Sequence, residues 1–348
     1  MNTNRRLQEL DALRGIAAVA VVFFHFTMNR NQALLGFNIG CMGVDLFFII
    51  SGFVIFMSIQ NNKDYLHFIR GRFIRLFPAY WVAVTFTTLL IIIKNRTFYF
   101  DMHHVERVNF LSNKYLFNMS MLNHFFEIAY IDGPFWTLTV ELIFYLFIVL
   151  LMAINGIKHF NSIGLVILFF CAIPPLFNNN LIKDIFDRLP LLSYFPLFFA
   201  GIIFYKMKFD KITFSRVLII VLTLVVQISL FHFSYRNANY LKLHEYIFTL
   251  IGIYLVFLLL ILDRLTFIVN PLTINLGRLS YSLYLIHQYL SITVLIPLFQ
   301  KYTSFWPSAM ASFIVVLLLA ELINRTIERP AMVVLKNRVF KSRRFETA

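Results

Sequence analysis

The chain has 348 residues, of which 59% are hydrophobic and only 14% are charged. A soluble domain carries roughly 25% charged residues, so this composition, with a mean hydropathy of +0.75, excludes an ordinary soluble fold. The net charge of +14 is accounted for by basic residues that flank membrane helices and contact anionic lipid, with no need for a nucleic-acid partner. We therefore predict an all-α, polytopic membrane protein.

Apolar segments long enough to cross about 30 Å of hydrocarbon recur along the whole sequence. We expect about ten, at residues 10–28, 41–60, 78–94, 134–154, 160–177, 191–206, 213–233, 246–262, 274–299 and 307–325. No connection between them is long enough for a soluble domain, so we predict a single membrane domain over residues 1–348. An even number of spans with most basic residues inside places both termini, including a basic tail at about 329–348, in the cytoplasm.

Two polar residues in the first segment share one face of the predicted helix. Arg14 and His25 are eleven positions apart in LDALRGIAAVAVVFFHF, which on an α-helix is a rotation to within roughly 20° and a rise of about 16 Å. Polar groups inside a membrane are costly and normally face a protein or water-lined interior. With the N-terminus cytoplasmic, Arg14 lies near the inner surface and His25 near the outer one.

Two buried carboxylates are expected near the depth of His25. Asp45 lies about five residues below the outer end of the second segment, where it can orient an imidazole and raise its basicity. The alternative is that Asp45 caps its own helix or pairs with a neighbouring span for packing alone. Glu141 lies about eight residues inside FWTLTVE, and a carboxylate at that depth is either functional or ties two helices together. Trp136, at the outer end of the same segment, can stack on a sugar ring or simply belong to an interfacial aromatic belt.

A basic segment precedes the third span. In YLHFIRGRFIRLFPAYW, arginines alternate with apolar side chains, which predicts a short interfacial helix on the cytoplasmic side that ends at Pro78. Arg72 and Arg75 can hold phosphate groups of a cytoplasmic substrate, since the guanidinium fork matches phosphate, or they can bind lipid headgroups.

The last two segments carry further polar residues. In LGRLSYSLYLIHQYL, Tyr284 and His287 share a face and can line a polar path or bond across helices. In the tenth segment, Arg325 is four residues after Glu321 and three before Glu328. We expect an intrahelical ion pair there rather than catalysis.

Other chemistry is disfavoured by the sequence. His103, His104, Glu106, His124 and Glu127 occur in one loop, but no ligand motif of useful specificity is present, so we predict no metal site. Cys41 and Cys171 have no redox or ligand spacing and are predicted to be packing residues. No GxSxG, Walker or GxGxxG motif occurs.

Several motifs together resemble one family, the integral-membrane acyltransferase family 3. They are LDALRGIAAVAVVFFHF, GVDLFFIISGF, RGRFIRLFPAYW, FWTLTVE, LGRLSYSLYLIH and the terminal ERP, in that order along almost the entire chain. The resemblance implies ten helices, an acyl-CoA donor reached from the cytoplasm and an acceptor at the outer face. By position it makes Arg14 and His25 the essential pair. The sequence HQY departs from the histidine and nearby proline found in many members, which weakens the assignment of His287.

The predicted function is O-acyl transfer, of acetyl or another short acyl group, from acyl-CoA to a hydroxyl of an envelope polysaccharide or glycolipid. His25 is the general base or an acyl carrier, oriented by Asp45 or Glu141, and no cofactor is tightly bound. The predicted substrate-binding residues are Arg14, Arg72, Arg75, Trp136, Tyr284 and His287.

The expected location is the bacterial cytoplasmic (inner) membrane, with the bilayer and possible glycan-assembly proteins as partners. The alternatives are a transporter or flippase of envelope glycans and a scaffold component of an assembly complex. A transporter is disfavoured because no internal repeat with matching broken helices is seen. The sequence does not identify the acceptor, the acyl chain or the oligomeric state.

Overall fold

The computed structural model describes residues 7–28, 36–61, 64–94, 106, 109–175, 177, 180–233 and 239–334. All regular elements in these ranges are helices, which confirms the predicted class. The chain divides into two compact units. Unit 1 comprises Met1–Arg30, Leu35–Phe68 and Leu146–Ser280, and unit 2 comprises Asn31–Leu34, Ile69–Tyr145 and Tyr281–Ala348.

Within the described ranges, seven helical segments are long and apolar enough to span a membrane. They are Gln8–Thr27, Asn38–Gln60, Tyr65–Lys94, Gly133–Ala153, Leu243–Ile261, Pro271–Phe299 and Phe305–Val334. Fewer helices than the ten expected therefore have the length and apolar composition of a membrane span. The cytoplasmic placement of the termini stays a prediction.

Three of the predicted spans form shorter helices. They are α8 (Phe160–Cys171), α10 (Phe195–Phe209) and α11 (Phe214–Ser229). Helix α8 ends shortly before Pro174, because proline and the residue before it disfavour helical continuation. Helix α11 begins at Phe214, as predicted, because the Thr213 hydroxyl accepts a hydrogen bond from the backbone N–H of Arg216 and caps the helix, and it ends at Ser229, four residues before the predicted end.

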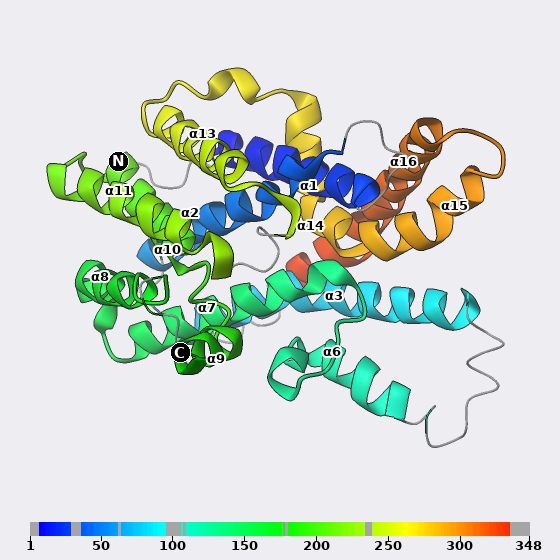
Figure 1. The fold of residues 1–348 in the computed structure, drawn as a ribbon, viewed down its shortest axis with the longest axis horizontal. Coiled ribbons are helices and arrows are strands. Elements are labelled where there is room, and N and C mark those ends of the chain that lie inside the picture. The colour runs from blue at the N-terminus through cyan, green and yellow to red at the C-terminus, as the bar shows by residue number, and fades with distance from the viewer. Residues whose placement is uncertain are drawn as a thin grey trace, which may run out of the picture. The chain divides into compact units, whose positions relative to one another are not determined.

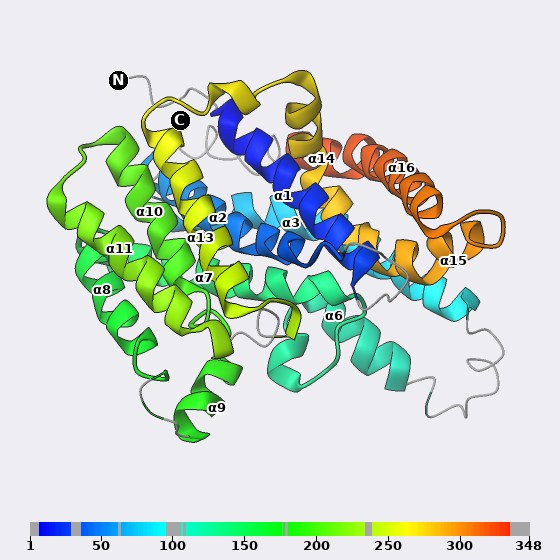
Figure 2. The ribbon, with the colours of Figure 1, turned by 45° about the horizontal axis from the view of Figure 1, so that its top comes forward.

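Helix α10 is the core of unit 1. It contacts α2 (Gly43–Asn61), α8, α11 and α13 (Leu243–Ile261), as Figures 1 and 2 show. The backbones of α2 and α10 approach closely at two glycines. A Cβ on Gly52 would lie 2.1 Å from the carbonyl oxygen of Phe198, and one on Gly201 would lie 2.1 Å from that of Ile49. Small residues allow this packing between helices in a membrane, where lipid is as apolar as the side chains.

The remaining elements of unit 1 surround this pair. Helix α1 (Gln8–Thr27) contacts α2 and the 3-10 turn η1 (Asn38–Met42). The shorter elements are η5 (Gly156–His159), α9 (Asn180–Arg188), η6 (Phe231–Phe233) and η7 (Thr266–Ile268). Cys41 and Cys171 are both buried, in accordance with packing roles.

In unit 2, α3 (Tyr65–Lys94) corrects the sequence prediction of a separate interfacial helix. The helix continues through Pro78 without a break. Proline removes the backbone donor that would bond the carbonyl of Ile74, a loss that membrane helices tolerate. The Tyr281 hydroxyl donates a hydrogen bond to the nearby carbonyl of Leu76 at 2.7 Å, and Phe73 stacks on Phe77 with centroids 4.4 Å apart.

The other elements of unit 2 include three π-helical segments, η2 (Phe110–Leu116), η8 (Leu290–Leu295) and η9 (Asn324–Glu328). The last two continue long helices, since η8 follows α14 (Pro271–Tyr289) and η9 follows α16 (Phe305–Ile323). The remaining elements are α6 (Phe117–Ser120), η3 (Asn123–Phe126), η4 (Gly133–Phe135), α15 (Ile296–Phe299) and the first part of α7 (Trp136–Ala153). The part of α7 from Leu146 on and the part of α14 up to Ser280 belong to unit 1.

Candidate active site

Helix α1 places Arg14 and His25 in unit 1 as two half-buried polar groups. One guanidinium nitrogen of Arg14 lies 3.4 Å from the Asp11 carboxylate, one turn earlier on the same helix. Asp11 is itself buried, so the pair places opposite charges near the start of α1. Arg14 thus belongs to a local charge pair, and its predicted role in substrate binding stays a prediction.

The imidazole of His25 is oriented by its own helix. Its Nδ1 lies 2.9 Å from the carbonyl oxygen of Val21. A carbonyl oxygen can only accept a hydrogen bond, so Nδ1 carries the hydrogen and the neutral ring has its lone pair on Nε2. The ring of Phe24 packs edge-on against His25 with centroids 4.8 Å apart. The geometry therefore prepares Nε2 as the basic nitrogen.

Asp45 lies in the first turn of α2, also in unit 1, and is fully buried. It interacts electrostatically with Tyr254 of α13. Helices α1 and α2 pack together, which places His25 and Asp45 on adjoining helices. The orientation of His25 by Asp45 stays a prediction.

Unit 2 brings Arg72, Arg75 and Glu141 together. We define the arginine cluster as Arg72, Arg75, Glu141, Tyr145, Tyr281 and Glu328. The two arginines are three residues apart on α3, so they share a face. The guanidinium carbon of Arg72 lies 5.6 Å from the centre of the Tyr145 ring, within cation–π range. Arg75 interacts electrostatically with both carboxylates and both phenols of the cluster.

The carboxylates of the arginine cluster have hydrogen-bond donors of their own. The Tyr145 hydroxyl donates a short hydrogen bond to Glu141 one turn earlier on α7. Glu328 Oε2 accepts from the Ser282 hydroxyl at 2.7 Å and from the Asn324 amide at 3.0 Å. Glu141 thus has counter-charges within unit 2, and its predicted action on His25 stays a prediction.

The expected ion pair in the last helix is only half correct. Arg325 does pair with Glu321, one turn earlier. Glu328 bonds instead to Ser282 of α14 and to Asn324, and it interacts electrostatically with Arg75. The π-helical segment η9, which contains Arg325 and ends at Glu328, turns the two residues away from the ordinary helical spacing.

A second polar group of unit 2 joins the start of α7 to α14. The hydroxyls of Thr137 and Tyr284 lie 2.8 Å apart and at 3.0 and 3.2 Å from the carbonyl oxygen of Pro134. Since each hydroxyl has one hydrogen, one of them donates to the carbonyl and the other donates to its neighbour. His287 is fully buried, and its Nδ1 lies 2.8 Å from the carbonyl oxygen of Tyr284. Trp136 is half-buried at the start of α7, and its predicted stacking on a sugar stays a prediction.

Asp132, which the sequence analysis did not single out, lies just before α7 and bonds to the backbone of α14. Its carboxylate accepts backbone hydrogen bonds from Gly133 at 2.8 Å and from Tyr289 of α14 at 3.3 Å. Burial raises the pKa of Asp132 to about 7, although these two hydrogen bonds oppose the shift. The DGP sequence before an apolar segment was an available signal, since Asp is a common helix cap.

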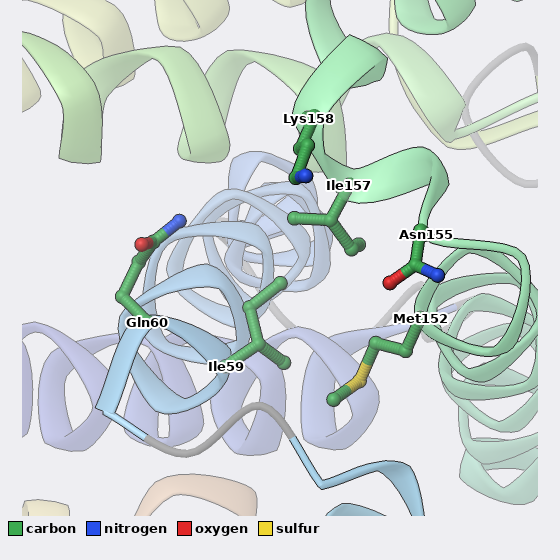
Figure 3. A pocket seen from close by; sticks show the side chains of 6 residues that line it. All are labelled: Ile59, Gln60, Met152, Asn155, Ile157 and Lys158. Atoms are coloured by element: carbon green, nitrogen blue, oxygen red, sulfur yellow. The ribbon is translucent and has the colours of Figure 1, made fainter.

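A hollow of about 110 Å³ lies in unit 1, where the ends of α2 and α7 and the turn η5 meet. Figure 3 shows the side chains around it. It is lined by Ile59, Gln60, Met152, Asn155, Ile157 and Lys158. None of the predicted site residues lines it, so it is not the predicted reaction centre. The described residues hold no cluster of three potential metal ligands, and His103 and His104 lie outside them.

Comparison with known proteins gives matches over much of the chain. A family model described as an acyltransferase domain matches residues 7–325. A provisionally named acetyltransferase of Acidianus two-tailed virus is 27% identical over 288 residues, which cover 79% of this chain and 80% of that protein. Nodulation protein 10 of Rhizobium leguminosarum bv. viciae is 29% identical over 160 residues, 41% of this chain and 44% of that protein.

A provisionally named peptidoglycan O-acetyltransferase of Bacillus subtilis is 28% identical over 158 residues. That match covers 41% of this chain and 23% of the Bacillus protein, so it reaches less than a quarter of the relative's length. No solved structure matches the chain significantly.

Proposed function

The chain belongs to acyltransferase family 3, and from this premise we propose that it is a multi-pass membrane enzyme that moves an acetyl group from acyl-CoA to a hydroxyl of an envelope glycan. The donor enters from the cytoplasm and the acceptor is presented at the outer face of the cytoplasmic membrane. The acceptor is an envelope polysaccharide or a lipid-linked saccharide. The similarity to the peptidoglycan O-acetyltransferase of Bacillus subtilis supports a carbohydrate acceptor.

The observation that carries this proposal is the orientation of His25. Its Nδ1–H donates to the carbonyl of Val21, which fixes the tautomer with the lone pair on Nε2. A general base needs this arrangement, because the nitrogen that accepts the substrate proton must not already carry one. Asp45 is buried on the adjoining helix α2 and is the predicted carboxylate partner of His25 in the same unit.

In the proposed reaction, Nε2 of His25 takes the proton of the acceptor hydroxyl. The hydroxyl oxygen then forms a bond to the thioester carbonyl carbon, and the carbon–sulfur bond of the donor breaks. The proton passes from the imidazolium to the departing thiolate, so free CoA and a sugar ester result. An acetyl group carried on His25 is the alternative route, and it would label the enzyme when the acceptor is withheld.

The arginines of α3 in unit 2 are the proposed donor-binding groups. Arg75 makes no hydrogen bond to any residue in the described part of the chain, which leaves its five donors available for phosphate oxygens. Arg72 is engaged with the Tyr145 ring and lies on the same face of α3. Arg14 contributes positive charge on α1. Trp136, Tyr284 and His287 line the acceptor path in this proposal.

The test measures ester groups on envelope glycans and the transfer of labelled acetyl from acetyl-CoA in membranes. His25→Ala is expected to lower transfer by about 100-fold or more, the usual contribution of a general base. His244→Ala is the matched control, because His244 is exposed at the start of α13. If His25→Ala at normal protein level keeps full transfer, the assignment is wrong. A deletion strain in which the glycan changes in amount or location, with its esters intact, indicates a transporter.

A further inference from the structure

Glu328 is held in place by two hydrogen bonds that do not involve an arginine. The Ser282 hydroxyl and the Asn324 amide both donate to Oε2, at 2.7 and 3.0 Å. Both partners are buried, so they fix the carboxylate. The cation expected from sequence spacing, Arg325, pairs with Glu321 instead. A different cation interacts with this fixed carboxylate.

That group is Arg75. Its side chain is half-buried on α3 and interacts electrostatically with Glu328 and Glu141. No hydrogen bond joins Arg75 to any residue in the ranges that the structure describes. Glu328 therefore offsets the charge of the guanidinium without occupying its donors. An uncompensated charge in such a place is strongly unfavourable, whereas a charge balanced at a distance remains able to bind another anion.

We propose that Glu328, clamped by Ser282 and Asn324, is the resident counter-charge of Arg75 and sets how tightly Arg75 binds the phosphate groups of the donor. This inference rests on the proposed role of Arg75 in holding acyl-CoA. When the donor is absent, Glu328 stabilises the guanidinium. When the donor is present, the same carboxylate repels the phosphate and keeps the affinity low enough for free CoA to leave.

The proposal predicts that removing the charge of Glu328 tightens CoA binding, whereas a merely structural role predicts no tightening. Glu328→Gln removes the negative charge and retains an oxygen that can accept from Ser282. We expect it to bind CoA about tenfold more tightly than the wild type, the change that one nearby unit charge produces in a partly buried site. The same variant should unfold at a lower temperature without anions and regain more of its stability when CoA is added. If Glu328 only packed the helices, binding would weaken.

The experiment uses the purified full chain in lipid nanodiscs, with CoA and inorganic pyrophosphate as separate probes. Glu321→Gln is the matched control, because Glu321 pairs with Arg325 on the same helix, and it should bind both probes like the wild type. Glu328→Asp keeps the charge and should restore near wild-type affinity. In an Arg75→Gln background, Glu328→Gln should give no tightening.

Two results overturn the proposal. One is a Glu328→Gln variant that binds CoA and pyrophosphate no more tightly than Glu321→Gln. The other is tightening that persists when Arg75 is replaced. If Glu328→Gln does not fold, Ser282→Ala keeps the charge but releases the carboxylate toward Arg75, and unchanged or tighter binding there would also refute the idea. A wild type that transfers no acetyl from acetyl-CoA refutes the proposed function alone, because pyrophosphate still reports the coupling between Arg75 and Glu328.

Discussion

Replacing Gly277 with alanine is expected to inactivate the enzyme without touching the reacting groups. Gly277 lies on α14 against the backbone of α1, and a Cβ there would stand 1.9 Å from the carbonyl oxygen of Asp11. Ordinary van der Waals contact begins near 3.4 Å, so the methyl group intrudes by roughly 1.5 Å. The obstructing atoms are backbone, which cannot rotate away as a flexible side chain would. Helix α1 must therefore move.

The expected loss of folding stability is small, whereas the expected loss of transfer rate is large. Overpacking a tight site costs about 1–3 kcal/mol, and alanine returns about 0.5–1 kcal/mol through its helix propensity. The net loss of at most about 2.5 kcal/mol still leaves a folded protein. Helix α1, however, carries Arg14 and His25, and a displacement of about 1 Å at a reacting group can lower a rate by about 100-fold.

The assay is acetyl transfer from labelled acetyl-CoA in membranes with equal amounts of each variant, together with thermal unfolding in detergent. Gly252→Ala on α13 is the control, because a Cβ there meets nothing within 4 Å, so its activity should stay within about twofold of the wild type. A Gly277→Ala variant with wild-type activity would show that α1 need not sit where this contact holds it, and the reasoning would fail.

Three further outcomes are expected. Burial raises the pKa of Asp132 to about 7, so its contribution to stability is complete at low pH and is lost as pH rises through that value. The melting temperature should therefore fall between about pH 4, the ordinary pKa of an Asp carboxyl, and about pH 7 in the wild type and not in Asp132→Asn. Tyr284→Phe should cost about 1 kcal/mol in unfolding free energy, since Thr137 keeps its bond to Pro134. Gly52→Ala should reduce folded yield and cost about 1–3 kcal/mol, because its Cβ meets a backbone carbonyl at 2.1 Å.

Each of these has a simple check. Asp187→Asn on the exposed face of α9 should retain the wild-type fall in melting temperature, and an Asp132→Asn profile of the same shape contradicts the assignment. Thr137→Val should cost more than Tyr284→Phe, because it removes the hydroxyl that bonds both Tyr284 and Pro134. A Gly52→Ala protein with the yield and melting temperature of Gly252→Ala would contradict the close contact between α2 and α10.

Hydropathy predicted the helical class well but not the length of every helix. It counts apolar residues, whereas helix ends depend on prolines and caps. The segment at 160–177 is apolar throughout, yet α8 ends at Cys171 ahead of Pro174. Conversely, Pro78 was expected to end a helix, and α3 runs straight through it. A membrane helix can continue through a proline, and hydropathy does not show where it does.

The candidate site was predicted best where one helix sets the geometry. The shared face of Arg14 and His25 follows from a regular α1, and the Val21 carbonyl that fixes His25 is one turn away on the same helix. The arginine cluster could not be predicted in this way, because Arg72, Glu141 and Glu328 come from three segments far apart in the sequence. Only the Glu141–Tyr145 bond, between residues four apart, could have been read from spacing alone.

Glu328 shows why spacing misleads at the end of the last helix. The rule that residues three or four apart face each other assumes 3.6 residues per turn, and it holds for Glu321 and Arg325. The π-helical turn η9 accommodates an additional residue, which rotates the following side chains by about 100° relative to a regular helix. That rotation brings Glu328 to Ser282 and into the field of Arg75. Because π-helical turns are costly in isolation and recur at functional sites, the turn itself supports a role for Glu328 beyond packing.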